Sequence, residues 1–137
     1  LGAVQVVRHA LPALRKGGRS SVVMFSTVAV NTGMPFHASV AAAKGAVEGL
    51  VRSLAAELAA AGIRVNAIAP SLTDTPLASA LLSTPEKREA AARRHPLQRI
   101  GTVDDMSGLA VFLLSENSSW ITGQVIGADG GMGALRT

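Results

Sequence analysis

The chain has 137 residues, of which 48% are hydrophobic, and a formal net charge of +4 at pH 7. This length suits a single domain, and the composition excludes a disordered or fibrous chain. No apolar run could span a membrane, no signal-peptide pattern occurs and cysteine is absent. We therefore expect a cytoplasmic protein without disulfides or a bound metal. Arginines gather only between positions 88 and 99 and aromatic residues make up 3%, so a solvated basic face is expected rather than a nucleic-acid site.

Helical spacing of apolar residues predicts a first helix over residues 1–16, which two glycines end. Because the chain begins inside this pattern, we expect it to be part of a longer protein. Residues 21–25 predict a strand that is buried on both faces, as in a parallel sheet. Ser26 and Thr27 follow at its carboxyl end, which is where open α/β sheets bind ligands.

Residues 39–61 contain no proline and are rich in alanine and leucine, which predicts one long helix ending at Gly62. Its large apolar face consists of Val47, Leu50, Val51, Leu54 and Leu58. A second stripe carries only small residues, namely Ala42, Ala46, Gly49, Ser53, Ala56 and Ala60. A narrow polar wedge contains Lys44, Glu48 and Arg52 at i, i+4 spacing. A strand over residues 63–69 follows directly, so the helix is expected to be a crossover between parallel strands.

The remaining segments alternate between helix and strand signals. Thr84 followed by proline predicts the N-terminus of a short helix that runs to about Arg94. Thr102 opens a second helix with a capping-box pattern. The expected buried stripe of that helix is Met106, Leu109, Ala110, Leu113 and Leu114. Residues 120–131 predict a last strand that runs into a glycine-rich tail.

The runs at residues 41–50 and 64–70 resemble the C-terminal half of a short-chain dehydrogenase/reductase. In that family the long helix opens with Tyr-x-x-x-Lys, and the next strand ends in Asn-x-x-x-Pro-Gly. The resemblance implies an α/β fold: the C-terminal part of a doubly wound, Rossmann-like parallel sheet, with three strands and flanking helices. Residues 1–137 would form one partial domain, in which the insertion 76–101 is a substrate lid. The family's Gly-x-x-x-Gly-x-Gly cofactor turn does not occur here, so an N-terminal part is expected to supply it.

The resemblance also assigns catalytic positions. Val40 stands where the family has its proton-donating tyrosine, and the chain contains no tyrosine. Thr27 matches the catalytic serine, thirteen positions earlier. Lys44 matches the lysine that binds the nicotinamide ribose. His37 is a candidate proton relay, with an ordinary loop histidine as the alternative.

At the end of the second strand the resemblance implies a cofactor site for NAD or NADP. The residues assigned to it, together with Lys44, are Pro70, Ser71, Thr73 and Thr75. Ser71 replaces the family's glycine and narrows the approach of the backbone to a cofactor. Thr75 matches the threonine that binds the nicotinamide carboxamide, and its alternative role is a helix N-cap.

Two functions follow from these assignments. The first is an NAD(P)-dependent oxidoreductase that acts on a small carbonyl or alcohol, with activity that is impaired or atypical because Val40 cannot exchange a proton. The second is a catalytically inactive relative that binds a nucleotide or serves as a scaffold. In either case a homodimer or homotetramer is expected, assembled through the long helix and the last strand, with no nucleic-acid or membrane partner.

Overall fold

The structure is a computed structural model that describes residues 2–136. Its elements follow the sequence in the order α1 (Gly2–Gly17), β1 (Ser20–Phe25), η1 (Val28–Val30), α2 (Ala38–Leu58), η2 (Ala59–Ala61), β2 (Ile63–Pro70), η3 (Pro76–Leu82), α3 (Pro85–Ala92), α4 (Val103–Leu114), η4 (Glu116–Ser118) and β3 (Val125–Ala128). Elements named η are 3-10 helices. Among these residues no helix combines the length and the apolarity that a membrane crossing requires.

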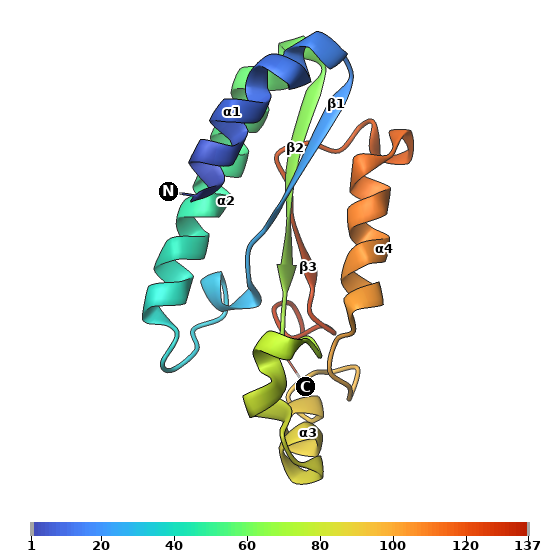
Figure 1. The fold of residues 1–137 in the computed structure, drawn as a ribbon. Helices are drawn as coiled ribbons and strands as arrows, with labels where there is room; N and C mark the ends of the chain where they lie inside the picture. Colours follow the sequence, from blue (N-terminus) through green and yellow to red (C-terminus); the bar gives the residue numbers. More distant parts are fainter. Residues whose placement is uncertain (1, 137) are drawn as a thin grey trace.

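The three strands form one parallel sheet in the order β1-β2-β3. Figure 1 shows α1 and α2 together on one side of this sheet and α4 on the other, while η3 and α3 lie beyond the carboxyl ends of the strands. Each parallel connection therefore passes through a helix, as parallel pairing requires. This arrangement confirms the predicted three-stranded, Rossmann-like α/β fold.

The core lies between β2 and α2. The central strand is the most deeply buried element, with Val65, Ala67 and Ile68 fully inaccessible. Val51, Ala55 and Leu58 are the buried apolar residues of α2. The helix ends as predicted, because η2 prolongs it by one turn and Gly62 then takes the left-handed conformation at φ 72°.

Three predictions about burial and length were wrong in detail. In β1 only Met24 is buried and Phe25 is 45% exposed, because β1 is an edge strand of this sheet with one neighbour. Leu114 at the end of α4 is 55% exposed, since only Leu113 of this helix turns fully into the core. The last strand is restricted to Val125–Ala128, where it pairs with β2.

The predicted helix starts are confirmed. Thr84 accepts a hydrogen bond from the backbone N–H of Lys87 at the start of α3. Thr102 forms a complete capping box with Asp105 at the start of α4. The short helix α3 ends at Ala92, two residues before the predicted end, which is an ordinary difference for a helix terminus.

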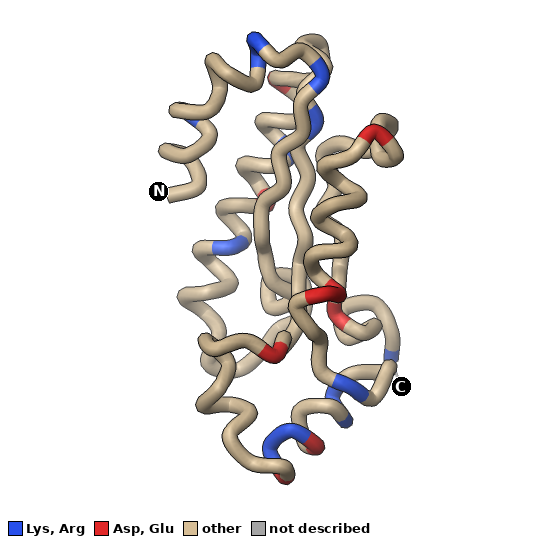
Figure 2. Tube along the Cα trace, turned by 45° about the vertical axis from the view of Figure 1, so that its right-hand side comes forward, with Lys and Arg blue, Asp and Glu red and all other residues tan. Residues whose placement is uncertain are grey.

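The basic segment of the chain is largely neutralised by ion pairs. Figure 2 shows acidic residues interspersed with the basic ones around α3. Arg88 pairs with Asp74 at 2.8 Å, and Arg93 pairs with Glu89 within α3. Paired charges of opposite sign create only a weak net field around this segment.

Candidate functional site

The predicted lysine and hydroxyl belong to the same end of the sheet. Lys44, in the second turn of α2, donates a hydrogen bond of 2.8 Å from Nζ to the backbone carbonyl oxygen of Phe25, the last residue of β1. Thr27 lies two residues farther along the chain and is half-buried. The ammonium group is therefore held at the carboxyl end of β1, the strand that Thr27 follows in the chain.

Thr27 is fixed by its role as N-cap of η1. Its Oγ1 accepts a hydrogen bond of 3.3 Å from the backbone N–H of Ala29. A threonine hydroxyl carries one donor hydrogen in addition to its acceptor lone pairs, so accepting this bond leaves the hydroxyl hydrogen available. Thr27 can therefore still donate a hydrogen bond to a substrate oxygen.

The two other candidate catalytic residues lie at the start of α2. Val40 is 46% exposed and presents only methyl groups. His37 occupies the N-cap position of α2, and its Nδ1 lies 2.7 Å from the carbonyl oxygen of Pro35, which can only accept. Nδ1 of His37 therefore carries a hydrogen, and Nε2 remains the ring atom that could exchange a proton with a ligand.

The side chains at the end of β2 differ in whether they can reach a ligand. Ser71 uses its hydroxyl within the fold, because Oγ lies 2.8 Å from Nε2 of His95 and 3.1 Å from Sδ of Met132. Thr73 donates its hydroxyl hydrogen to the carbonyl oxygen of Ser71 over 3.1 Å. Thr75 stands at the N-cap position of η3 without a side-chain capping bond. The Thr75 hydroxyl therefore does not cap the helix that follows it.

The donor set agrees with the needs of a nicotinamide cofactor. An ammonium group has three donors, of which Lys44 uses one for Phe25 and has two left. Thr75 adds a hydroxyl that could bind an amide. The cofactor roles of Pro70, Ser71, Thr73 and Thr75 stay predictions. Thr73 has spent its hydroxyl hydrogen on Ser71 but keeps acceptor lone pairs, and the Ser71 hydroxyl is engaged with His95 and Met132.

Sequence reasoning missed a buried carboxylate beside this site. It placed Glu48 in a polar wedge with Lys44 and Arg52, but Glu48 is only 2% exposed. Its Oε1 accepts a hydrogen bond of 2.6 Å from the hydroxyl of Ser26, which is itself 4% exposed. The i, i+4 spacing predicted the pair with Arg52, which the structure confirms at 3.4 Å, but it could not reveal a partner on β1.

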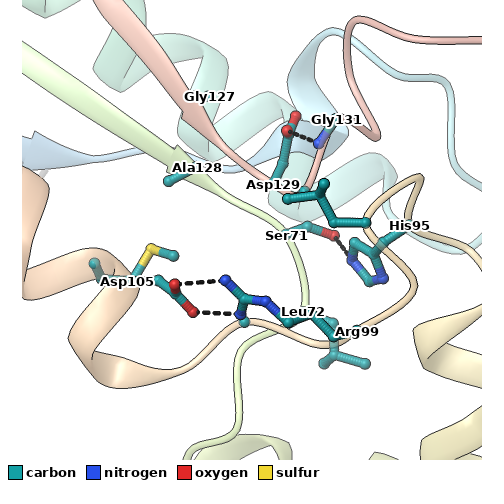
Figure 3. A pocket seen from close by; sticks show the side chains of 13 residues that line it. Ser71, Leu72, His95, Arg99, Asp105, Gly127, Ala128, Asp129 and Gly131 are labelled. Carbon is teal, nitrogen blue, oxygen red and sulfur yellow. Dashed lines mark hydrogen bonds and ion pairs between the residues drawn. The ribbon is translucent and has the colours of Figure 1, made fainter.

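Sequence reasoning also missed His95, which is 2% exposed. Its Nδ1 lies 2.9 Å from the carbonyl oxygen of Ala91, so this nitrogen carries a hydrogen and donates. Its Nε2 faces Ser71, as Figure 3 shows. The lone histidine before a proline gave no periodic signal, so its burial between α3 and the end of β2 could not be anticipated.

His95 and Ser71 line a cavity of about 290 Å³ beneath the carboxyl ends of β2 and β3. Figure 3 shows Arg99 and Asp105 joined across one wall and Asp129 on another. Arg99 holds Asp105 by two hydrogen bonds of 2.7 Å each. Together with the N–H and O–H of Thr102, this guanidinium keeps the pKa of the Asp105 carboxyl well below its usual range. Thr27, Val40 and Lys44 do not line this cavity, so of the residues assigned to the candidate site it contains only Ser71.

Comparison with known proteins identifies the family. The fold is a Rossmann-like α/β arrangement, and the family described as enoyl-(acyl carrier protein) reductase matches residues 1–133. The chain is 41% identical over 132 residues to the 3-oxoacyl-[acyl-carrier-protein] reductase FabG of Thermotoga maritima, covering 96% of this chain and 52% of that protein. The chain belongs to the short-chain dehydrogenase/reductase family.

Further relatives include proteins of different activity. The inactive 2-(S)-hydroxypropyl-CoM dehydrogenase 2 of Xanthobacter autotrophicus is 38% identical, with 98% of this chain and 60% of that protein covered. A short-chain dehydrogenase/reductase structure from Mycobacterium ulcerans superposes with a TM-score of 0.91 at 37% identity, covering 98% of this chain and 49% of that one. The gluconate 5-dehydrogenase of Burkholderia cenocepacia in complex with NADP and tartrate also gives a TM-score of 0.91, at 30% identity and 98% and 53% coverage. The chain thus spans about half the length of the relatives it matches.

Proposed function

We propose that this chain forms the substrate-facing part of an oxidoreductase that transfers a hydride between NAD or NADP and a small carbonyl or alcohol. The observation that carries the proposal is the bond from Lys44 to the carbonyl of Phe25, which holds an ammonium group at the end of the strand that Thr27 follows by two residues. Family membership supports the reaction class, and the NADP-bound gluconate 5-dehydrogenase supports a nicotinamide cofactor.

Each residue has a stated task in this proposal. A bound nicotinamide supplies or accepts the hydride. Lys44 binds the ribose hydroxyls with its two remaining donors, and Thr75 binds the carboxamide with its hydroxyl. Thr27 donates a hydrogen bond to the substrate oxygen and so stabilises the negative charge that develops there. Because Val40 has no exchangeable proton, water supplies the proton, either directly or by way of Nε2 of His37, which takes one proton from water and passes it on. The segment 76–101, with η3 and α3, covers the bound substrate as a lid.

A second candidate function is favoured by Val40. Loss of a positioned general acid typically costs a factor of about 10²–10⁴ in rate, so this chain is also compatible with a subunit that binds a nucleotide without turnover. The relative from Xanthobacter autotrophicus whose name marks it as inactive supports this alternative.

In both cases we propose a homodimer or homotetramer assembled through α2 and β3. The small residues of α2 that form its second stripe (Ala42, Ala46, Gly49, Ser53, Ala56 and Ala60) are all exposed. In the described sheet β3 pairs on one side only, with β2. Light scattering on the purified protein tests this proposal, and Gly49→Glu should then shift the mass towards the monomer. A monomeric wild type would contradict it.

Fluorescence titration with NADH and with NADPH, followed by a turnover assay over a panel of ketones and alcohols, tests the function. Binding with turnover selects the oxidoreductase, and binding without turnover selects the inactive relative. If the full-length protein, with the N-terminal part that is expected to carry the cofactor turn, binds neither nucleotide, both candidates are wrong.

A further inference from the structure

Two contacts join α2 to the end of β1. On the strand they start from consecutive residues, because the Phe25 carbonyl oxygen accepts from Lys44 Nζ and the Ser26 hydroxyl donates to Glu48. On the helix the two partners are four residues apart and therefore lie on the same face, one turn from each other. Two contacts of this kind fix both the rotation of α2 about its axis and its position along the strand.

The second of these contacts requires an explanation, because burying a carboxylate is costly. Glu48 lies in the buried stripe of α2 that continues through Val51, Ala55 and Leu58, where an aliphatic residue would pack without a desolvation penalty. Its polar neighbours are the Ser26 hydroxyl at 2.6 Å and Nη2 of Arg52 at 3.4 Å. A carboxylate at this position gains directional hydrogen bonds that an aliphatic residue cannot provide.

Ser26 is also held from its other side. Its backbone N–H donates to the carbonyl oxygen of Ile68 over 2.7 Å, which extends the β1–β2 pairing by one residue. Ser26 is therefore fixed to β2 by its backbone and to α2 by its hydroxyl. Thr27 follows directly, so its position depends on both attachments.

We propose that Glu48 and Ser26 are positioning residues that hold Lys44 and Thr27 in place for the cofactor and the substrate. This inference rests on the proposed function, in which Lys44 binds the ribose. Neither Glu48 nor Ser26 needs to touch a ligand, since each acts through the residue it places. Removal of the Glu48 carboxylate leaves the Ser26 hydroxyl without its acceptor, and the Lys44 turn of α2 is then free to move away from Phe25.

The first test measures Lys44 itself and needs no cofactor. The rate at which an amine-specific reagent labels each lysine is followed by peptide mass spectrometry, with Lys16 and Lys87 as internal references. In Glu48→Ala and Ser26→Ala, Lys44 should be labelled several-fold faster while the references keep their rates. Glu48→Gln retains an acceptor oxygen and should resemble the wild type, as should Glu57→Ala, which removes an exposed carboxylate from the same helix.

Faster labelling of all three lysines would indicate that a variant has unfolded. In that event Glu48→Asp is the variant that tests the inference, because it keeps the charge but shortens the side chain by one methylene, which moves the acceptor away from Ser26. Glu48→Asp should accelerate the labelling of Lys44 alone. Equal Lys44 labelling in the folded variants and the wild type would overturn the inference.

The second test measures the NADPH affinity of the full-length protein by fluorescence. Loss of one such hydrogen bond corresponds to a roughly tenfold weaker Kd in Glu48→Ala and in Ser26→Ala. Because both substitutions break the same contact, the double variant should bind about as weakly as Glu48→Ala alone, and Glu48→Gln should restore binding. If both alanine variants bind NADPH as the wild type does while Lys44→Ala does not, the positioning role is wrong. If Lys44→Ala also binds normally, the proposed ribose role fails, and the labelling result still decides the positioning role.

Discussion

Asn66, at the centre of β2, holds Gln124 in place by accepting its backbone N–H at Oδ1 over 3.0 Å. The other end of the same amide donates from Nδ2 to the carbonyl oxygen of Ile121 over 2.9 Å. Asn66 is fully buried, so it ties the loop before β3 to the middle of the sheet. This places β3 in register with β2, with Ala67 opposite Val125.

Asn66→Ala should therefore lower the stability of the chain. It leaves the Ile121 carbonyl and the Gln124 N–H without partners, at an expected cost of about 2–4 kcal/mol. Urea denaturation followed by circular dichroism measures this change. Asn31→Ala at an exposed position is the matched control and should stay within about 0.5 kcal/mol of the wild type. An Asn66→Ala variant as stable as this control would show that the loop is held by other contacts.

Lys44→Ala should weaken the binding of NADPH or NADH by about 10–100-fold, the usual effect of losing a charge-assisted hydrogen bond. The reason is the placement of Nζ beside Phe25 at the carboxyl end of β1. Fluorescence titration gives the Kd, and Lys16→Ala, which removes a distant exposed lysine, serves as the control. Equal affinity in Lys44→Ala and Lys16→Ala would remove Lys44 from the cofactor site.

Val40→Tyr should raise kcat for carbonyl reduction by about 10²–10⁴-fold, because it restores a general acid one helical turn before Lys44. Val40 is 46% exposed, so there is room for the larger ring. The comparison is with Val40→Phe, which adds the ring without the hydroxyl and should leave kcat low. A similar kcat in both variants would mean that the tyrosine position does not supply the proton.

Acid should destabilise the start of α4 through Asp105. The hydrogen bonds from Arg99 and Thr102 lower the pKa of this carboxyl in the folded chain. A lowered pKa contributes stability above the unfolded value of about 3.9, and this contribution is lost as the pH falls below it. The drop in urea midpoint between pH 7 and pH 3 should therefore be smaller in Asp105→Asn than in the wild type. Asp104→Asn, next to it, should retain the full drop, and an equal drop in all three proteins would exclude this role.

The regular elements could be predicted because their signals are local. Gly62 ended the long helix as expected, since a left-handed residue after a helix is best supplied by glycine. Thr102 and Asp105 were recognised as a capping box, because the two residues satisfy each other's backbone within four positions. The carboxyl end of β1 was predicted as a site because open α/β sheets bind ligands beyond the ends of their strands, and this stays a prediction.

Glu48 and His95 could not be predicted because their partners are distant in the sequence. Glu48 falls on the polar side of a helical projection, and only the structure shows that Ser26 approaches it from β1. His95 likewise depends on Ser71, which belongs to the end of another strand. Periodicity reports which residues are polar, but it does not report which polar residues meet inside the fold.

The strand order carries a consequence for how the chain folds. The sheet contains no hairpin, because both of its pairings join parallel strands that are separated by a helical crossover. Neither pairing can form from a local turn, so the rate of folding is set by the closure of long loops. While those loops close, β2 exposes two unpaired edges. Refolding at high protein concentration should consequently lose material to aggregates that join through these edges, and dilution should recover it.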